Sequence, residues 1–123
     1  MSKKSKPRLI KLGEAAYTPR FEYGDQAKVS SFCGEEDGSQ LGVGVAKLKS
    51  ANIPWTIKYD EFILVLEGVL TVTTEAGELT ASAMQAIWLP AGTKLTYKSD
   101  NAYLLYAIPV SYTHLTLPTI CSV

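Results

Sequence analysis

Histidine is nearly absent from this chain, and its scarcity limits the chemistry that the protein can perform. Among 123 residues there are one histidine, His114, and two cysteines, Cys33 and Cys121. Catalysis by a serine or cysteine nucleophile needs a base, and that base is usually histidine. Two cysteines this far apart form neither a metal-binding spacing nor a disulfide framework. The composition therefore argues against a nucleophilic hydrolase and against a metal centre built from imidazoles.

The chain also lacks net charge and long apolar segments. Twelve basic residues balance twelve acidic ones, so no overall field favours nucleic acid or an anionic membrane surface. The lysine-rich beginning is followed by too few apolar residues for a signal peptide. The uncharged stretch at the end carries too many polar residues and prolines for the bilayer interior. We expect a cytoplasmic protein that binds neither nucleic acid nor membranes.

The last fourteen residues differ in composition from the rest of the chain. Residues 110–123 contain no Ala, Gly, Lys, Arg, Asp or Glu, and they resemble a translated sequencing adapter. A segment of that kind is excluded from fold reasoning, which removes His114 and Cys121 as candidates. We expect a non-native tail whose deletion leaves folding intact. The alternative is a genuine threonine-rich strand at the C-terminus.

Short runs of β-branched and aromatic residues alternate with turn residues, a pattern that predicts an all-β fold. No stretch has a convincing apolar repeat at helical spacing. The expected strands are 8–12, 27–32, 41–48, 55–59, 61–66, 69–74, 78–80, 86–89, 94–98 and 103–108. We expect one domain, in which 1–26 is a partly extended arm and 27–109 forms a barrel.

Two segments resemble the two motifs of the RmlC-like cupin superfamily. The first is Trp-Thr-Ile-Lys-Tyr-Asp-Glu at 55–61, with Gly68 following after six further residues. The second is Ile-Trp-Leu-Pro-Ala-Gly at 87–92, which resembles the Pro-x-Gly turn of the second motif. The resemblance covers residues of about 40–108, and the first segment is most similar to the ethanolamine-utilization EutQ-type branch. It implies a single-domain cupin β-barrel, or jelly roll.

The departures from the cupin pattern concern the metal ligands. Where metal-binding cupins have two histidines, this chain has residues 54–57, Pro-Trp-Thr-Ile, and Leu95 stands where the second motif has its histidine. Met84 replaces the glycine that usually opens that motif. Of the four usual ligands only Glu61 remains, and a transition metal normally needs imidazole nitrogens as well. We predict neither a metal nor another cofactor.

The resemblance places Glu61 in the barrel interior, where burial would raise the pKa of its carboxyl group. Such a group suits a general acid or base, or an anchor for an ammonium group, but it can also simply fix a strand. Tyr59 is the predicted acid–base partner. The candidate ligand-binding residues are Trp55, Thr56, Glu61, Tyr97 and Trp88. Alternation along 86–89 does not decide whether Trp88 or its neighbours face the interior.

The resemblance implies a role in ethanolamine utilization and association with its bacterial microcompartment. Three hypotheses stay open. The chain is a small-molecule-binding or accessory barrel; it is a metal-independent isomerase, lyase or acetate-kinase-like enzyme that uses Glu61; or it is a structural barrel filled by side chains. We also expect a homodimer, because open sheet edges are commonly covered by a partner chain. The N-terminal arm is a plausible covering strand.

Overall fold

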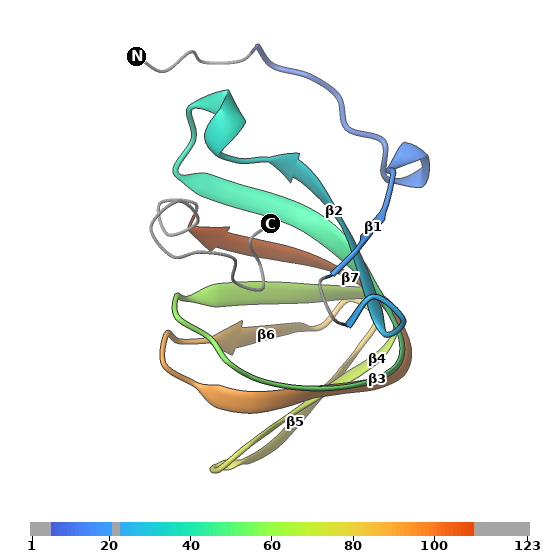
Figure 1. Ribbon diagram of the computed structural model, residues 1–123, viewed down its shortest axis with the longest axis vertical. Helices are drawn as coiled ribbons and strands as arrows, with labels where there is room; N and C mark the ends of the chain where they lie inside the picture. The colour runs from blue at the N-terminus through green and yellow to red at the C-terminus, as the bar shows by residue number, and fades with distance from the viewer. Residues whose placement is uncertain (1–5, 21–22, 110–123) are drawn as a thin grey trace.

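Antiparallel strands account for most of residues 6–20 and 23–109, the parts of the chain that the computed structural model describes (Figure 1). The strands are β1 (Thr18–Pro19), β2 (Ala27–Cys33), β3 (Leu41–Thr56), β4 (Glu61–Thr74), β5 (Gly77–Ser82), β6 (Ala86–Leu89) and β7 (Lys94–Pro109). The described residues also include two short 3-10 turns, η1 (Leu12–Glu14) and η3 (Glu35–Asp37). The predicted all-β fold is confirmed. Within the described ranges, no helix is long and apolar enough to cross a membrane. The predicted tail, 110–123, lies outside the described residues.

The strands pair in the order β1-β2-β3-β7-β4-β5, and β6 pairs with β4. The three longest strands each extend over two runs that the sequence analysis separated: β3 includes 41–48 and the first two residues of 55–59, β4 includes 61–66 and 69–74, and β7 includes 94–98 and 103–108. The prediction of separate strands was wrong because each of these three strands bends between its two runs without leaving the sheet. Register shifts between β4 and β7 mark the bend, as β-bulges commonly do in barrels.

Gly68 stands at this bend, and its position explains the glycine of the first motif. Its φ is +82°, and a Cβ built on it would lie 2.1 Å from the carbonyl oxygen of Asn101. A residue with a side chain would meet both a backbone collision and an unfavourable left-handed conformation. The glycine therefore allows β4 to bend against β7.

The core lies inside the curved sheet, on the inward face of each strand. Its largest fully buried side chains include Ile53, Ile57, Val65, Leu70, Val72 and Leu89. In β6 the inward residues are Ile87 and Leu89, whereas Trp88 is 58% exposed on the outer face. The sequence did not decide which face of 86–89 lines the interior. In the structure that face carries Ile87 and Leu89, and Trp88 lies on the opposite one.

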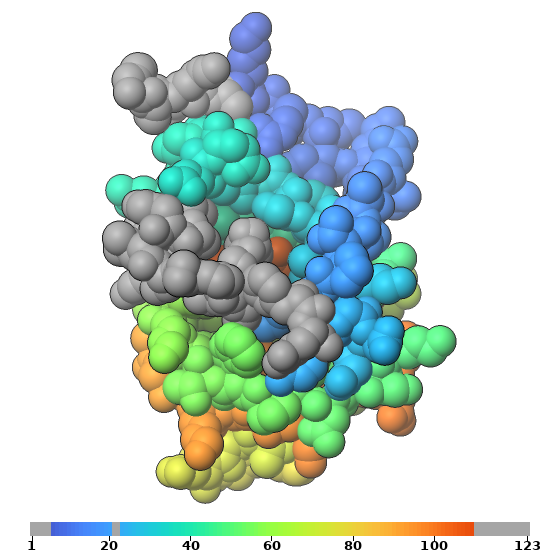
Figure 2. Space-filling view, viewed as in Figure 1, coloured from blue at the N-terminus to red at the C-terminus, as the bar shows by residue number. Residues whose placement is uncertain are grey.

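The N-terminal arm lies along one side of the barrel, as Figure 2 shows in blue. The expected strand at 8–12 is absent; instead Arg8 donates hydrogen bonds of 3.0 and 3.2 Å to the Asp37 carboxylate in η3. Farther along, β1 pairs with β2, so Thr18 lies opposite Val29. The arm thus covers the β2 edge of its own sheet and carries residue 20 toward the barrel.

Replacing Met84 with glycine should stabilise the protein by about 0.5–1 kcal/mol. Met84 adopts φ 71°, a left-handed conformation that costs an L-residue roughly 1–2 kcal/mol, and glycine gives back part of this through its greater freedom when unfolded. Its side chain is 76% exposed, so little packing is lost. Urea denaturation measures the gain. Met84→Ala keeps the strain and is the matched control; equal stabilities of the two variants would contradict this account.

Candidate functional site

Glu61 is the buried acid at the start of β4. It is 5% exposed and lies on the same face of the strand as Ile63 and Val65, which are also buried. Across the sheet it is opposite Leu89 of β6. The two-residue period of the strand therefore turns its carboxyl group into the apolar interior, and the predicted interior position of Glu61 is confirmed.

A tyrosine hydroxyl partners this carboxyl group. The Tyr97 hydroxyl, from β7, donates a 2.8 Å hydrogen bond to Oε1 of Glu61, and both side chains are buried. Burial raises the pKa of Glu61 because the charged form loses its hydration. The Tyr97 hydrogen bond and the positive charge of Arg20 act on the Glu61 pKa in the opposite direction and are the smaller effects.

Arg20 is the residue of this site that the sequence analysis missed. It follows β1, and its amide donates to the carbonyl oxygen of Ala27 at 3.1 Å. Its carbonyl oxygen in turn accepts a 2.9 Å bond from the amide of Tyr23. Its Nη2 atom is buried and has no hydrogen-bond partner in the described part of the chain. Nothing in the local sequence marks this arginine, because the pairing of β1 with β2 brings it to the barrel.

Arg20, Glu61 and Tyr97 line one cavity inside the barrel. Its volume is about 30 Å³, which gives room for about two water molecules. Tyr106 also lines it, and the remaining wall is apolar, formed by Val29, Ala46, Leu48, Ile53, Ile63 and Leu104. A few polar groups converging in an apolar enclosure are typical of sites that bind small molecules. The small volume fits a ligand of only a few heavy atoms.

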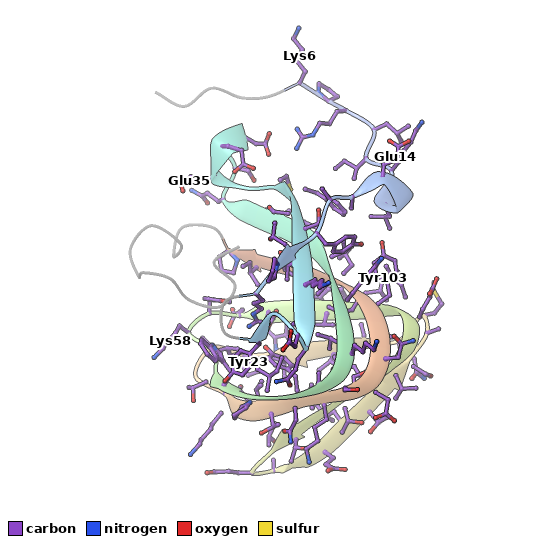
Figure 3. All side chains as sticks on the ribbon, turned by 45° about the vertical axis from the view of Figure 1, so that its right-hand side comes forward. Lys6, Glu14, Tyr23, Glu35, Lys58 and Tyr103 are labelled. Carbon is purple, nitrogen blue, oxygen red and sulfur yellow. The ribbon has the colours of Figure 1, made fainter. Side chains whose placement is uncertain are left out.

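The structure does not bring the other predicted residues to this cavity. Tyr59 is buried at 3% exposure but is not among the residues that line it. Trp55 packs edge-to-face on Tyr23, with ring centroids 6.4 Å apart, and with Thr56 it lines a separate groove toward the end of β3. Trp88, a candidate ligand-binding residue whose orientation the sequence left open, faces outward and does not line this cavity. Tyr23, the aromatic partner of Trp55 in this contact, is labelled in Figure 3.

Asp60, beside Glu61, joins the two cupin-like motifs. Its Oδ1 accepts a 2.9 Å hydrogen bond from the amide of Ala91 in the Pro-Ala-Gly turn. The same turn is held by Gly92, whose amide donates to the carbonyl oxygen of Ile57 at 2.8 Å. The motif residues thus fix the loop that leads into β4, and with it the position of Glu61. In residues 6–20 and 23–109 there is no group of three or more His, Cys, Asp or Glu arranged to hold a metal ion.

Comparison of the sequence with known proteins identifies the family to which this chain is similar. A family model described as ethanolamine utilisation protein EutQ matches residues 3–113. A protein of Salmonella typhimurium (strain LT2) named acetate kinase EutQ is 32% identical over 80 residues, 63% of this chain and 35% of that protein. The chain therefore spans about a third of the length of this curated relative.

Solved structures show the same fold. A crystal structure of ethanolamine utilization protein Q from Salmonella typhimurium has a TM-score of 0.80 at 24% identity, covering 89% of this chain and 93% of that one. A cupin-2 domain-containing protein from Shewanella frigidimarina has a TM-score of 0.54 at 18% identity, covering 58% of this chain and 72% of its own. The predicted cupin barrel is confirmed. Since the family model matches residues 3–113, which include every described residue, this chain belongs to the EutQ family of ethanolamine utilisation proteins.

Proposed function

We propose that this chain is a small-molecule-binding barrel of ethanolamine utilization, with the cavity around Glu61 and Tyr97 as its binding site. We further propose that it acts in the cytoplasm, in association with the bacterial microcompartment of that process. The observation that carries the proposal is a buried carboxyl group facing a cavity with a hydrogen-bonded tyrosine. Family membership supports the cellular role.

The energetics favour binding over a purely structural role. A buried carboxyl group costs free energy unless hydrogen bonds compensate it, and the described interior supplies Glu61 with the one from Tyr97. An apolar residue at position 61 would fill this interior at lower cost. The free space beside the carboxyl group is the feature that a structural barrel packed with side chains would not need.

Acetate kinase activity is the second candidate, because curated relatives carry that name. Phosphoryl transfer depends on positive groups that stabilise the transferred phosphate, and Arg20 places one cation at the cavity. Formation of acetyl phosphate from ATP and acetate, followed with the chain itself, tests this candidate.

Replacing Glu61 with glutamine should weaken binding of any probe that donates a hydrogen bond to the Glu61 carboxylate by about 10- to 150-fold. Glutamine keeps the shape of the side chain but removes its ionisable group, and a hydrogen bond to a charged group contributes roughly 1.5–3 kcal/mol. Isothermal titration with acetate, acetamide and ethanolamine, the probes of three charge types, measures the effect. Glu67→Gln, exposed on the same strand, is the matched control.

The result that would reject this function is equally clear. If no probe binds the natural chain, and Glu61→Gln changes only the melting temperature, Glu61 serves the fold and the barrel is structural. Tyr97→Phe provides a second test, since it removes the 2.8 Å hydrogen bond and leaves the ring in place. Probe binding that is unchanged in both variants would show that neither Glu61 nor Tyr97 contacts the ligand.

A further inference from the structure

Arg20 reaches the cavity from a part of the chain that a barrel does not require. The strand pairing of Thr18 with Val29 and of Pro19 with Lys28 sets its position. The amide bond to Ala27 and the carbonyl bond from Tyr23 then fix its backbone on both sides. The guanidinium group is therefore delivered to the interior by defined backbone contacts, and the site is incomplete without the arm.

Arg20, which lines the cavity, retains an unused buried donor on its guanidinium group. Arginine carries five N–H donors and no acceptor, and Nη2 of Arg20 is buried without a hydrogen-bond partner among the described residues. Leaving such a donor unpaired away from water is costly. Arg8, the other arginine described in the arm, shows the contrast, because the Asp37 carboxylate accepts hydrogen bonds from its guanidinium.

Glu61 does not neutralise Arg20 as an ion pair. The ion pair found among the described residues joins Arg8 to Asp37. No nitrogen of Arg20 lies within 4.0 Å of the Glu61 carboxylate oxygens. Oε1 of Glu61 instead accepts the hydroxyl of Tyr97. The cavity thus combines a cationic donor that has no hydrogen-bond partner among the described residues with a carboxyl group that already accepts one, and the unused N–H donor suits an anion.

We propose that Arg20 is the ligand-recognition residue of this cavity, and that it makes the site select a small oxyanion such as a short carboxylate. The inference rests on the proposed binding function and names its ligand class. The planar fork of a guanidinium matches two oxygens of a carboxylate. The cavity of about 30 Å³ restricts the ligand to a few heavy atoms, and the apolar wall beside the polar groups suits a short alkyl end.

Calorimetric titration of the natural chain tests the ligand class with defined probes. Sodium acetate and sodium formate are compared with acetamide, which has the shape of acetate without its charge, and with ethanolammonium chloride, all at equal ionic strength. We expect acetate and formate to bind and the neutral and cationic probes not to bind. Ethanolammonium binding that depends on Glu61 would overturn the assignment to Arg20 while leaving the proposed binding function in place.

Variants test the residue itself. Arg20→Gln should weaken acetate binding at least about tenfold, because the charged donor is lost. Arg20→Lys keeps the charge without the fork and should bind with intermediate affinity. Arg8→Gln, which changes an exposed arginine of the same arm, should bind acetate as the natural chain does. Near-ultraviolet circular dichroism checks that each variant keeps its aromatic packing.

Three further outcomes would reject the proposal. Acetate binding of equal strength in folded Arg20→Gln and in the natural chain shows that the arginine does not recognise the anion. If Arg20→Gln does not fold, folded Arg20→Lys that binds as tightly as the natural chain contradicts the requirement for a guanidinium fork. Absence of binding by every probe, combined with a Glu61→Gln variant that changes only the melting temperature, would reject the proposed function as well.

Discussion

The Glu61→Gln variant should be more stable than the natural chain at pH 8 and should lose this advantage at pH 4. Burial raises the pKa of Glu61 in the folded protein above its ordinary value of 4.5. A raised pKa means that the folded state holds the proton more tightly than the unfolded state does. This contribution to the free energy of unfolding is fully present below about pH 4.5. It is lost as the pH rises through the folded pKa.

The size of the effect follows from the shift. Each unit by which the folded pKa exceeds the unfolded one corresponds to about 1.4 kcal/mol. Glutamine cannot ionise, so the variant avoids the cost of a buried charge at high pH and still accepts the Tyr97 hydrogen bond. The charged and titratable groups that line the same cavity are Arg20, from the arm, and Tyr97 and Tyr106, from β7. Arginine and tyrosine ordinarily keep their charge states between pH 4 and 8, so the titration in this range belongs to Glu61.

Urea denaturation from pH 4 to pH 8 measures the effect. The free energy of unfolding of the natural chain should fall more steeply with rising pH than that of Glu61→Gln. Glu67→Gln is the control, because it removes an exposed carboxyl group from the same strand. Parallel pH profiles for Glu61→Gln and the natural chain would show that the Glu61 carboxyl group titrates like one in water.

We propose that this chain forms a homodimer through the outer face around Trp88 and Phe62, and a charge introduced at either residue should then yield monomers. These two side chains lie opposite each other on β6 and β4 and are 58% and 41% exposed. Their row continues through Ala107 on β7 to Val43 on β3. Leu64, Leu105 and Ala86 form the neighbouring row on the same outer face. We propose a second copy of this chain as the occupant, because an uncharged sheet face is complementary to itself across a two-fold axis.

Sedimentation velocity at tens of micromolar checks the dimer. Phe62→Glu and Trp88→Glu should each raise the dissociation constant by about a hundredfold or more, since burying an unpaired charge in an apolar interface is strongly unfavourable. Val69→Glu is the matched control, because Val69 is exposed to a similar extent, 46%, farther along β4. A natural chain that sediments as a monomer at these concentrations would reject this interface.

Local patterns in the sequence determined the fold class and the position of one acid. Alternating apolar residues and turn residues indicated an all-β domain, and the two motifs placed Glu61 inside a cupin barrel. The same local signals gave the turn at Gly92 and the glycine at position 68. These features depend on the two-residue period of a strand and on the backbone freedom of glycine, which neighbouring residues already define.

Contacts between distant parts of the chain decided the rest of the site. Alternation divides 86–89 into two sets, but only packing against the rest of the barrel turns Ile87 inward and Trp88 outward. Tyr97, rather than Tyr59, bonds to Glu61 because the barrel brings β7 to the beginning of β4. Arg20 joins them only when β1 pairs with β2. No local pattern encodes such a meeting, because it depends on strand register and on the bend of the whole sheet.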